Sequence, residues 1–342
     1  MENVQANPST ISKLTAEHFD ISRQAVNGHL SRLVKEGALR PKGATRNKAY
    51  ELAPIVEWQE QYSLTGSPVP SEDYVWRTDI EKVLGPLPDN VRNIWHYGFT
   101  EMFNNAVDHS EGKSIWVYIE KTAVNTQMVI ADDGVGIFRK IQKAMNLEDE
   151  RHALLELSKG KLTTDPDRHT GEGIFFTSRV FDNFDILSGG VFFSHEFGKE
   201  EDWLSERVKP DDGGTAVFMR LSNHTARTTT EIFDEYTDGD GDFGFNKTVV
   251  PVNLAQYGND QLISRSQAKR VMARVELFSK VILDFKDVPT IGQAFADEVF
   301  RVFAAAHPNI KIVAINTSPE VDHMILRAER TAVEDRGAKP SS

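Results

Sequence analysis

The sequence predicts an α/β protein of several domains, and three observations indicate this. First, 342 residues are too many for one ordinary domain core and suit two or three domains. Second, apolar residues recur at helical spacing near the N-terminus, over residues 9–37. Third, strand-like and helix-like segments alternate from residue 246 onwards, which is typical of a small α/β layer with mainly parallel strands.

The composition is that of a soluble globular protein, with 39% hydrophobic and 26% charged residues. The chain holds no cysteine, which excludes disulfides, thiolate metal sites and cysteine nucleophiles. No apolar run approaches the roughly 20 residues of a membrane-spanning helix, and the N-terminus MENVQANPST is polar. We therefore expect a cytoplasmic protein with no membrane partner.

The net charge of -12 is unevenly distributed. Residues 1–53 hold eight Lys/Arg against five Asp/Glu, a balance of +3, and the remainder holds 31 against 46, a balance of -15. A basic module therefore precedes an acidic body. Any contact with nucleic acid is expected within the first 53 residues.

The N-terminal module reads as two helices, residues 9–19 and 21–37, separated by a break at Asp20. Ser22 is placed to cap the second helix and Gly37 to end it. A basic hairpin follows, in which Gly43 is surrounded by Arg40, Lys42, Arg46 and Lys48.

This order over residues 1–55 resembles the winged helix-turn-helix family, and SRQAVNGHLSRLVKEGAL matches its recognition-helix pattern. The resemblance implies DNA binding, with the helix in the major groove and the hairpin on phosphates. The expected DNA contacts are Ser22, Arg23, Gln24, Asn27, Arg32, Arg46 and Lys48. A winged helix used only for protein contacts is the alternative. The family has a further helix ahead of the pair, and since only MENVQANP precedes it here, we expect that helix to be truncated.

The composition of residues 56–84, with prolines, glycine and serines, predicts a linker. The helical stripe of VRNIWHYGFTEMFNNAVDHS then places Glu101, Asn105 and His109 on neighbouring turns. Alone, a Glu or Asn on a helix is usually solvated, so the case for a site depends on the segments that follow.

Three glycine motifs follow this helix. Asp132 ends an apolar strand and precedes Gly134 and Gly136, which leave a bare backbone beside a carboxylate. Gly171 and Gly173 open a helix, whose free N–H groups suit phosphate. A glycine turn then leads into an alternating strand that begins at Thr215.

These motifs, in this order over residues 85–223, resemble the GHKL ATPase superfamily. The resemblance implies an α/β sandwich with a mixed sheet that binds ATP and Mg²⁺. It implies that Asp132 binds the adenine amino group, that Asn105 ligates Mg²⁺ and that Glu101 is the general base. The other nucleotide contacts would be Gly134, Gly136, Thr170, Gly171, Glu172, Gly173 and Thr215. Residues 139–171 would form a mobile lid, from which Lys159, Lys161 and Arg168 are candidates to reach the triphosphate.

After an acidic linker at residues 224–245, the domain at 246–330 resembles STAS-like domains of a family of unknown function, through Leu283–Phe285 and Phe295–Glu298. Residues 331–342 are predicted to be a flexible tail. Phosphorylated members of the wider fold carry a Ser at the start of the helix that contains Phe295–Glu298. The only hydroxyl in that neighbourhood here is Thr290, which is expected to be either a phosphoacceptor or a helix cap. The domain is predicted to bind a protein partner or control a homodimer.

Two functions follow from this organisation. The first is an ATP-binding transcriptional regulator with Mg-dependent ATPase activity, in which the nucleotide state governs DNA binding. The alternative is an anti-sigma-type protein serine/threonine kinase that acts on its own or a partner's STAS-like domain. An ATP-dependent effector in cellular defence is a third reading that no particular residue supports.

Overall fold

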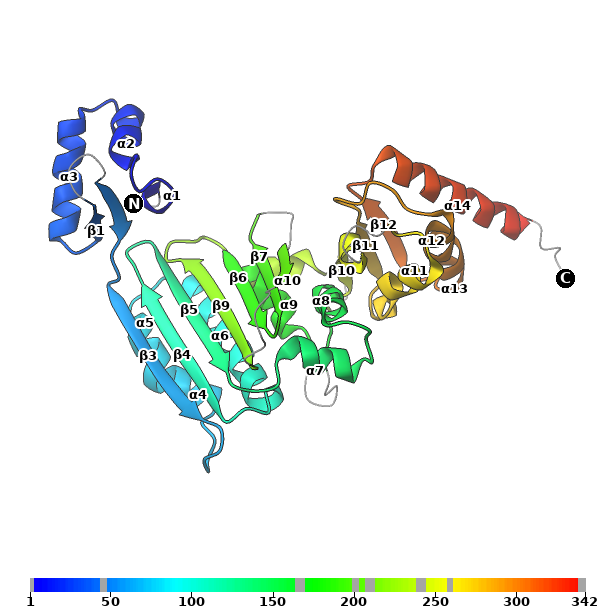
Figure 1. Cartoon of the computed structure of the whole chain (residues 1–342), viewed down its shortest axis with the longest axis horizontal. Coiled ribbons are helices and arrows are strands. Elements are labelled where there is room, and N and C mark those ends of the chain that lie inside the picture. Colours follow the sequence, from blue (N-terminus) through cyan, green and yellow to red (C-terminus); the bar gives the residue numbers. More distant parts are fainter. Residues whose placement is uncertain are drawn as a thin grey trace. The chain divides into compact units, whose positions relative to one another are not determined.

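The computed structural model describes residues 3–43, 48–163, 170–198, 203–206, 213–237, 244–256 and 261–337. The chain, drawn in Figure 1, divides into two compact units. The first unit comprises residues 1–136 and 177–229, and the second comprises residues 137–176 and 230–342.

The first unit begins with a four-residue helix at Asn3–Ala6, the short form expected for the helix ahead of the pair. The predicted order of helix, turn, helix and antiparallel hairpin follows it. The second helix begins after Ser22, whose hydroxyl accepts a hydrogen bond from Ala25 N–H at 3.2 Å, which confirms the predicted cap. Beyond its end, Gly37 adopts a φ of +76°. The elements are α1 (Asn3–Ala6), α2 (Ile11–Phe19), α3 (Arg23–Lys35), β1 (Leu39–Lys42) and β2 (Ala49–Leu52). They share an apolar core of Val4, Ile11, Ala16, Val26, Leu30, Leu39 and Tyr50.

A seven-stranded sheet follows, with the order β3-β4-β5-β9-β6-β7-β8 (Figure 1). Every neighbouring pair is antiparallel, so the expected mixed sheet is wrong. The consecutive strands β5 and β6 run in the same direction, but β9 lies between them and pairs antiparallel with both, so β5 and β6 do not pair with each other. The strands are β3 (Val56–Ser63), β4 (Ser114–Lys121), β5 (Asn125–Asp132), β6 (Asn183–Ser188), β7 (Val191–Glu196), β8 (Trp203–Glu206) and β9 (Thr215–Ser222).

The prediction of a linker over residues 56–84 is wrong. Its first part is the edge strand β3, which pairs with β4 along its whole length. Its last part forms three consecutive helical segments, α4 (Glu72–Val75), η2 (Trp76–Ile80) and α5 (Glu81–Leu84), with buried apolar side chains. Gly66, Pro68 and Pro70, which suggested a linker, lie in the short turn between these two parts.

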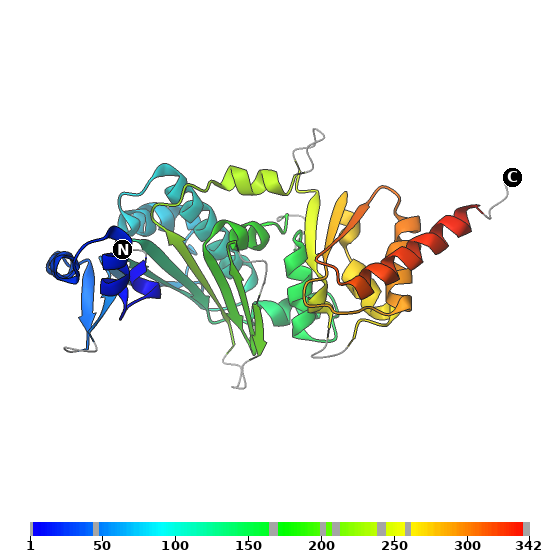
Figure 2. The ribbon, with the colours of Figure 1, turned by 90° about the horizontal axis from the view of Figure 1, so that it is seen from above.

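Helix α6 (Asp89–His109) packs on β4, β5 and β9. Figures 1 and 2 show α6 on the same face of the sheet as α4 and α5. Gly98 permits the close approach, because a Cβ at this position would lie 2.4 Å from Cε2 of Phe181. The core beneath the helix is aromatic, since Trp95, Phe99 and Phe103 are completely buried.

The second unit holds a parallel three-stranded sheet of order β10-β11-β12, which confirms the predicted parallel α/β layer. Its strands are β10 (Lys247–Pro251), β11 (Lys280–Asp284) and β12 (Lys311–Ile315). Its helices are η3 (Val252–Ala255), α11 (Arg265–Met272), η4 (Val275–Leu277), α12 (Gln293–Asp297), η5 (Glu298–Phe303), α13 (Ala304–Ala306) and α14 (Pro319–Gly337). A capping box between Ser264 and Gln267 begins α11.

The segment between the first two glycine motifs also belongs to the second unit. It forms α7 (Ile137–Ala144) and α8 (Glu150–Lys159), which precede α9 (Gly173–Val180). Helix α8 packs on β10 and η3, and residues 152–160 are all buried. The expectation of a mobile lid therefore fails for α8, since a helix buried on a sheet is held by its packing.

Two further boundaries differ from those predicted. The acidic linker at 224–245 contains α10 (Thr229–Glu235), whose Ile232 is buried, while residues 238–243 lie outside the described part of the chain. The predicted tail at 331–342 begins as helix, because α14 continues to Gly337. In the described part of the chain, no helix is both long enough and apolar enough to cross a membrane.

Candidate functional site

Three polar side chains lie in a row at one end of the seven-stranded sheet. Asp132 of β5 is opposite Thr215 of β9, and Thr215 is opposite Ser188 of β6. The hydroxyl oxygens of Ser188 and Thr215 are 3.4 Å apart, and the Ser188 hydroxyl donates to Gly214 O at 3.0 Å. The structure thus brings together Asp132 and Thr215, two of the residues expected to contact the nucleotide.

Two consecutive aspartates at the end of β5 differ in how their carboxylates are used. Exposed Asp133 accepts hydrogen bonds from the Ser114 amide at 3.0 Å, the Lys113 amide at 2.6 Å and the Ser114 hydroxyl at 3.1 Å. The bonds from the Ser114 and Lys113 amides lower the pKa of Asp133. Burial raises the pKa of Asp132, even though the amides of Gly134 and Thr215 donate to its carboxylate. Asp133 therefore has a structural role, whereas Asp132 is an acceptor held in a partly dehydrated place.

Bare backbone surrounds the Asp132 carboxylate. A Cβ on Gly134 would lie 2.0 Å from the Ser110 carbonyl oxygen. Gly214 has a φ of +77°, and a Cβ there would lie 2.0 Å from the Asp132 carbonyl oxygen. The Gly214 N–H donates to Gly134 O at 2.6 Å, which joins the loop after β5 to the start of β9. Only glycine fits these positions, because neighbouring backbone atoms fill the place that a Cβ would occupy.

The C-terminal end of α6 is attached to the same loop. The Ser110 carbonyl accepts a hydrogen bond from Val135 N–H at 2.9 Å. Glu101 and Asn105 are half-buried and follow Gly98 at spacings of three and seven, on the stripe that contacts Phe181 and Met219. Asn105 precedes Ser110 by about 7.5 Å of helix axis. Both predicted side chains therefore lie on the sheet-facing side of α6, between Gly98 and the Asp132 loop.

The described residues contain no cluster of three or more His, Asp or Glu side chains that could hold a metal ion. A Mg²⁺ ion needs few protein ligands when phosphate and water supply its other oxygens. The amide oxygen of Asn105 on the half-buried face of α6 suits such a role. The residues present are therefore compatible with Mg²⁺ bound together with a nucleotide.

The second glycine motif, Thr170–Gly173, lies in the second unit. Gly173 begins α9, as predicted. Gly171 has a φ of +73°, and a Cβ there would lie 2.5 Å from the carbonyl carbon of Leu162. Thr170 is exposed, and burial raises the pKa of Glu172 while Lys161 opposes this shift.

Lys159 cannot reach a triphosphate, so this prediction is wrong. Its side chain is 0% exposed. Its ammonium group donates to Glu156 Oε1 at 2.6 Å, to Arg270 O at 3.1 Å and to Ala273 O at 2.8 Å, which uses all three N–H donors. The periodicity of a charged helix does not reveal such burial, because two of the three partners, Arg270 and Ala273, lie more than a hundred residues further along the chain.

Lys161 and Arg168 are the other two cations that were expected to reach the triphosphate. Lys161 donates to Leu277 O at 3.1 Å, and its ammonium group lies 4.9 Å from the ring centroid of Phe278. Both contacts lie within the second unit. Arg168 lies outside the described residues.

The predicted DNA contacts are exposed wherever the structure describes them, and Arg46 lies outside the described residues. Three have partners: Ser22 caps α3, Asn27 Oδ1 accepts from the Ser12 hydroxyl at 2.9 Å, and Arg32 lies 3.6 Å from Glu36. Arg23 and Gln24 occupy the first turn of α3, and Lys48 lies 5.0 Å from the ring centroid of Tyr50 on the hairpin. The exposed residues among the predicted contacts thus include three cations, Arg23, Arg32 and Lys48.

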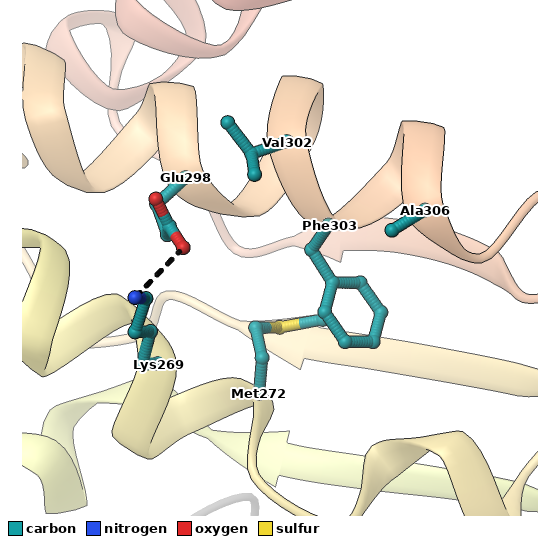
Figure 3. A pocket seen from close by; sticks show the side chains of 6 residues that line it. All are labelled: Lys269, Met272, Glu298, Val302, Phe303 and Ala306. Carbon is teal, nitrogen blue, oxygen red and sulfur yellow. Dashed lines mark ion pairs between the residues drawn. The ribbon is translucent and has the colours of Figure 1, made fainter.

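A shallow apolar pocket of about 310 Å³ lies between α11 and the helix formed by η5 and α13 (Figure 3). Lys269 and Glu298, 3.8 Å apart, flank one end of it, and Met272, Val302, Phe303 and Ala306 line the rest. None of the predicted nucleotide or DNA residues lies there. Thr290 is elsewhere in this domain and is half-buried; it is not a helix cap, because α12 begins after Gly292.

The comparison with known protein families found one match. The profile of the STAS-like domain of unknown function (DUF4325) matches residues 267–322. The chain contains a STAS-like domain. The matched residues run from α11 to the start of α14, and β10, outside the match, completes the sheet of this STAS-like domain. A search of curated proteins found no match.

Sequence reasoning missed three residues that shape the site, namely Ser110, Ser188 and Gly214. Gly214 was visible as part of the glycine turn before β9, and Ser188 precedes a Gly-Gly hairpin turn. Neither pattern says that the two residues meet. The strand order places β6 beside β9 and so brings Ser188 to Thr215.

Proposed function

We propose that this chain is a regulator that binds ATP with Mg²⁺, hydrolyses it, and uses its nucleotide state to govern DNA binding by the N-terminal module. The observation that carries the proposal is the row of Asp132, Thr215 and Ser188 beside the bare backbone of Gly134 and Gly214. The resemblance of the glycine motifs to GHKL ATPases supports the same conclusion.

Adenine recognition is the part with the most support. An amino group needs an acceptor, and Asp132 offers a carboxylate whose burial raises its pKa. A donor from the ligand would replace lost hydration and stabilise the ionised carboxylate. The hydroxyl of Thr215 lies beside this carboxylate in the strand register and would hold the second edge of the base.

The chemistry would be divided between two residues one turn apart on α6. Asn105 would ligate Mg²⁺, which neutralises phosphate charge when it is bound. Glu101 would orient the attacking water and accept its proton. Positioning and charge neutralisation normally provide most of the rate in phosphoryl transfer, so Glu101 would act mainly on kcat.

Regulation of DNA binding is proposed from charge and exposure. Arg23 and Gln24 stand at the N-terminal end of α3, which is the end that helix-turn-helix proteins place on base edges. Lys48 on the hairpin would neutralise phosphate. The connection between this module and the sheet is a single residue, Pro54. Before it, Ala53 N–H donates to Ala38 O in the module, and after it, Ile55 N–H donates to Lys121 O of β4. Such a short connection supports coupling between the module and the sheet.

The test is a DNA mobility shift with the full chain, without nucleotide and with ATP and Mg²⁺. A change in DNA affinity with nucleotide supports the switch. Equal affinity in both conditions contradicts the coupling, and failure of fluorescent ATP to bind in a parallel titration contradicts the nucleotide site itself.

A second candidate function, protein serine/threonine kinase activity, is favoured by the STAS-like domain, since this fold supplies phosphoacceptors to anti-sigma-type kinases. Incubation with radiolabelled ATP separates the two. Labelled protein that is lost in Glu101→Ala supports the kinase, whereas free phosphate alone supports the ATPase. The half-buried Thr290 is the hydroxyl to examine first.

A further inference from the structure

A buried network of ion pairs joins the STAS-like domain to the segment that precedes the second glycine motif. Glu156 of α8 accepts from Lys159 Nζ on Oε1 and from Arg274 Nη1, at 3.0 Å, on Oε2. The side chains of Glu156 and Lys159 are 2% and 0% exposed, so solvent screens their interaction little. One carboxylate oxygen thus binds Arg274 of the STAS-like domain. The other binds Lys159 of α8, whose ammonium group also donates to Arg270 O and Ala273 O of that domain.

Arg274 extends beyond this carboxylate to the backbone that follows α8. Its Nη2 donates to Gly160 O at 3.4 Å and to Lys161 O. One planar guanidinium therefore binds a side chain and two consecutive carbonyls, a geometry that a lysine does not reproduce. Arg274 itself has a φ of +62°, uncommon for a residue with a side chain, and the surrounding contacts hold it there.

The contacts continue directly to the second glycine motif. Leu162, the residue after Lys161, donates its N–H to Gly171 O at 3.0 Å. The Gly171 backbone lies so close to Leu162 that a Cβ would be 2.5 Å from the Leu162 carbonyl carbon. Arg274 and Gly171 are thus connected by two hydrogen bonds and one peptide bond.

The residues after the motif are attached to the same domain. Phe175 and Phe176 in the first turn of α9 contact Phe245, with ring centroids 4.5 Å and 4.9 Å apart. Phe245 in turn contacts Phe278, which precedes β11, at 5.1 Å. The motif is therefore anchored on both sides by groups that pack on the three-stranded sheet's domain.

We propose that the STAS-like domain, through Arg274, sets the conformation of the second glycine motif and thereby the affinity for the phosphate groups of the nucleotide. This inference rests on the proposed ATP binding. Arg274 is a positioning residue, since it acts through Lys161 and Leu162. A partner that binds the STAS-like domain would change ATP affinity, and by linkage ATP would change the affinity for that partner by the same factor.

The first experiment needs no nucleotide. Amide hydrogen exchange of residues 170–176 is compared in full-length wild type, Arg274→Gln and Arg330→Gln. Arg330 is exposed on α14 of the same domain, so its substitution makes the same charge change away from the network. We expect faster exchange in Arg274→Gln only, because the motif loses its anchor. Equal exchange in wild type and Arg274→Gln overturns the inference.

The second experiment measures binding of ATP and of adenosine, which lacks phosphate. Arg274→Gln is expected to weaken ATP binding about tenfold while adenosine binding stays unchanged. Unchanged ATP affinity, or an equal loss in Arg330→Gln, overturns the inference. A wild type that binds no ATP contradicts the proposed function, whereas the exchange experiment still decides whether Arg274 holds the motif.

A second variant tests the inference from the other side of the ion pair. Glu156→Gln keeps an oxygen acceptor and removes the charge that Arg274 pairs with. Glu156→Gln should change the amide exchange of residues 170–176 and the ATP affinity in the same direction as Arg274→Gln, but to a smaller extent. If Arg274→Gln does not fold, an unchanged Glu156→Gln overturns the inference and a shifted one supports it.

Discussion

Asp132 and Thr215 face each other across β5 and β9, and the Thr215 amide donates to the Asp132 carboxylate. Two residues far apart in the sequence thus form one surface at the end of the sheet. This pairing depends on the insertion of β9 between β5 and β6. It gives the proposed adenine site an acceptor and a hydroxyl side by side.

Replacement of Asp132 by Asn should weaken ATP binding by about 10- to 100-fold, because a charged hydrogen bond worth about 1.5–3 kcal/mol is weakened. Titration with a fluorescent ATP analogue measures the change. The matched control is Asp133→Asn, whose carboxylate bonds Ser114 and Lys113 and is expected to leave ATP affinity unchanged. Equal losses of ATP affinity in both variants would show that ATP binding depends on the negative charge at this end of β5 and not on Asp132 in particular.

The same pair of variants should show opposite effects on stability. Burial raises the folded pKa of Asp132 above 3.8, so folding loses stability as pH rises from 3.8 through the raised value. Asp132→Asn should therefore unfold at a higher Tm than wild type at about pH 7.5, and the gain should shrink as the pH falls towards 3.8.

For Asp133 the sign reverses. Its folded pKa is lowered from 3.8, so the carboxylate contributes stability above 3.8 that is lost as pH falls through the lowered value. Asp133→Asn should have a lower Tm than wild type at about pH 7.5. Thermal unfolding at about pH 7.5 checks both signs. The same sign for both variants would contradict the two assigned roles.

Removal of the Glu101 carboxylate should separate chemistry from binding. Glu101→Gln is expected to lower kcat for phosphate release by about 10²- to 10⁴-fold while ATP affinity changes little, because a general base acts in the transition state. Phosphate release and fluorescent ATP titration measure the two quantities. Asn104→Ala, on the neighbouring position of α6, is the control and should retain activity. A fully active Glu101→Gln would exclude Glu101 as the base.

A methyl group on Gly134 should destabilise the first unit. The new Cβ would lie 2.0 Å from Ser110 O, so Gly134→Ala must displace the end of α6 from the loop. The expected loss is about 1–3 kcal/mol in the free energy of unfolding. Gly28→Ala is the control: nothing lies within 4 Å of its Cβ, and α3 should gain about 0.5–1 kcal/mol. Denaturant unfolding measures both, and a neutral Gly134→Ala would contradict the close contact.

Local chemistry explains what could be predicted from the sequence. Ser22 caps α3 and Gly173 begins α9 because side-chain caps and bare glycines act within one turn of chain. The alternation of strands and helices after residue 246 predicted a parallel sheet, since successive parallel strands need a crossover. Asp132 and Thr215 were likewise predicted to be candidate site residues from strand ends and glycines, and their pairing across β5 and β9 agrees with one shared surface.

Long-range packing decided the rest. The strand β3 was hidden by the prolines of the turn after it, and its place at the sheet edge depends on β4. The antiparallel sheet depends on where β9 inserts. Lys159 looked like a surface cation until its three partners were seen, two of them carbonyls at the end of α11.

The sequence by itself therefore determined the order of the modules, the helix caps, the glycine turns and the STAS-like domain, because these depend on neighbours along the chain. Only the tertiary structure decided that Ser188 joins Asp132 and Thr215, and that Arg274 holds the backbone next to Gly171. The physical reason is that strand pairing and buried charge pairing are set by the lowest free energy of the whole fold, which no local pattern encodes.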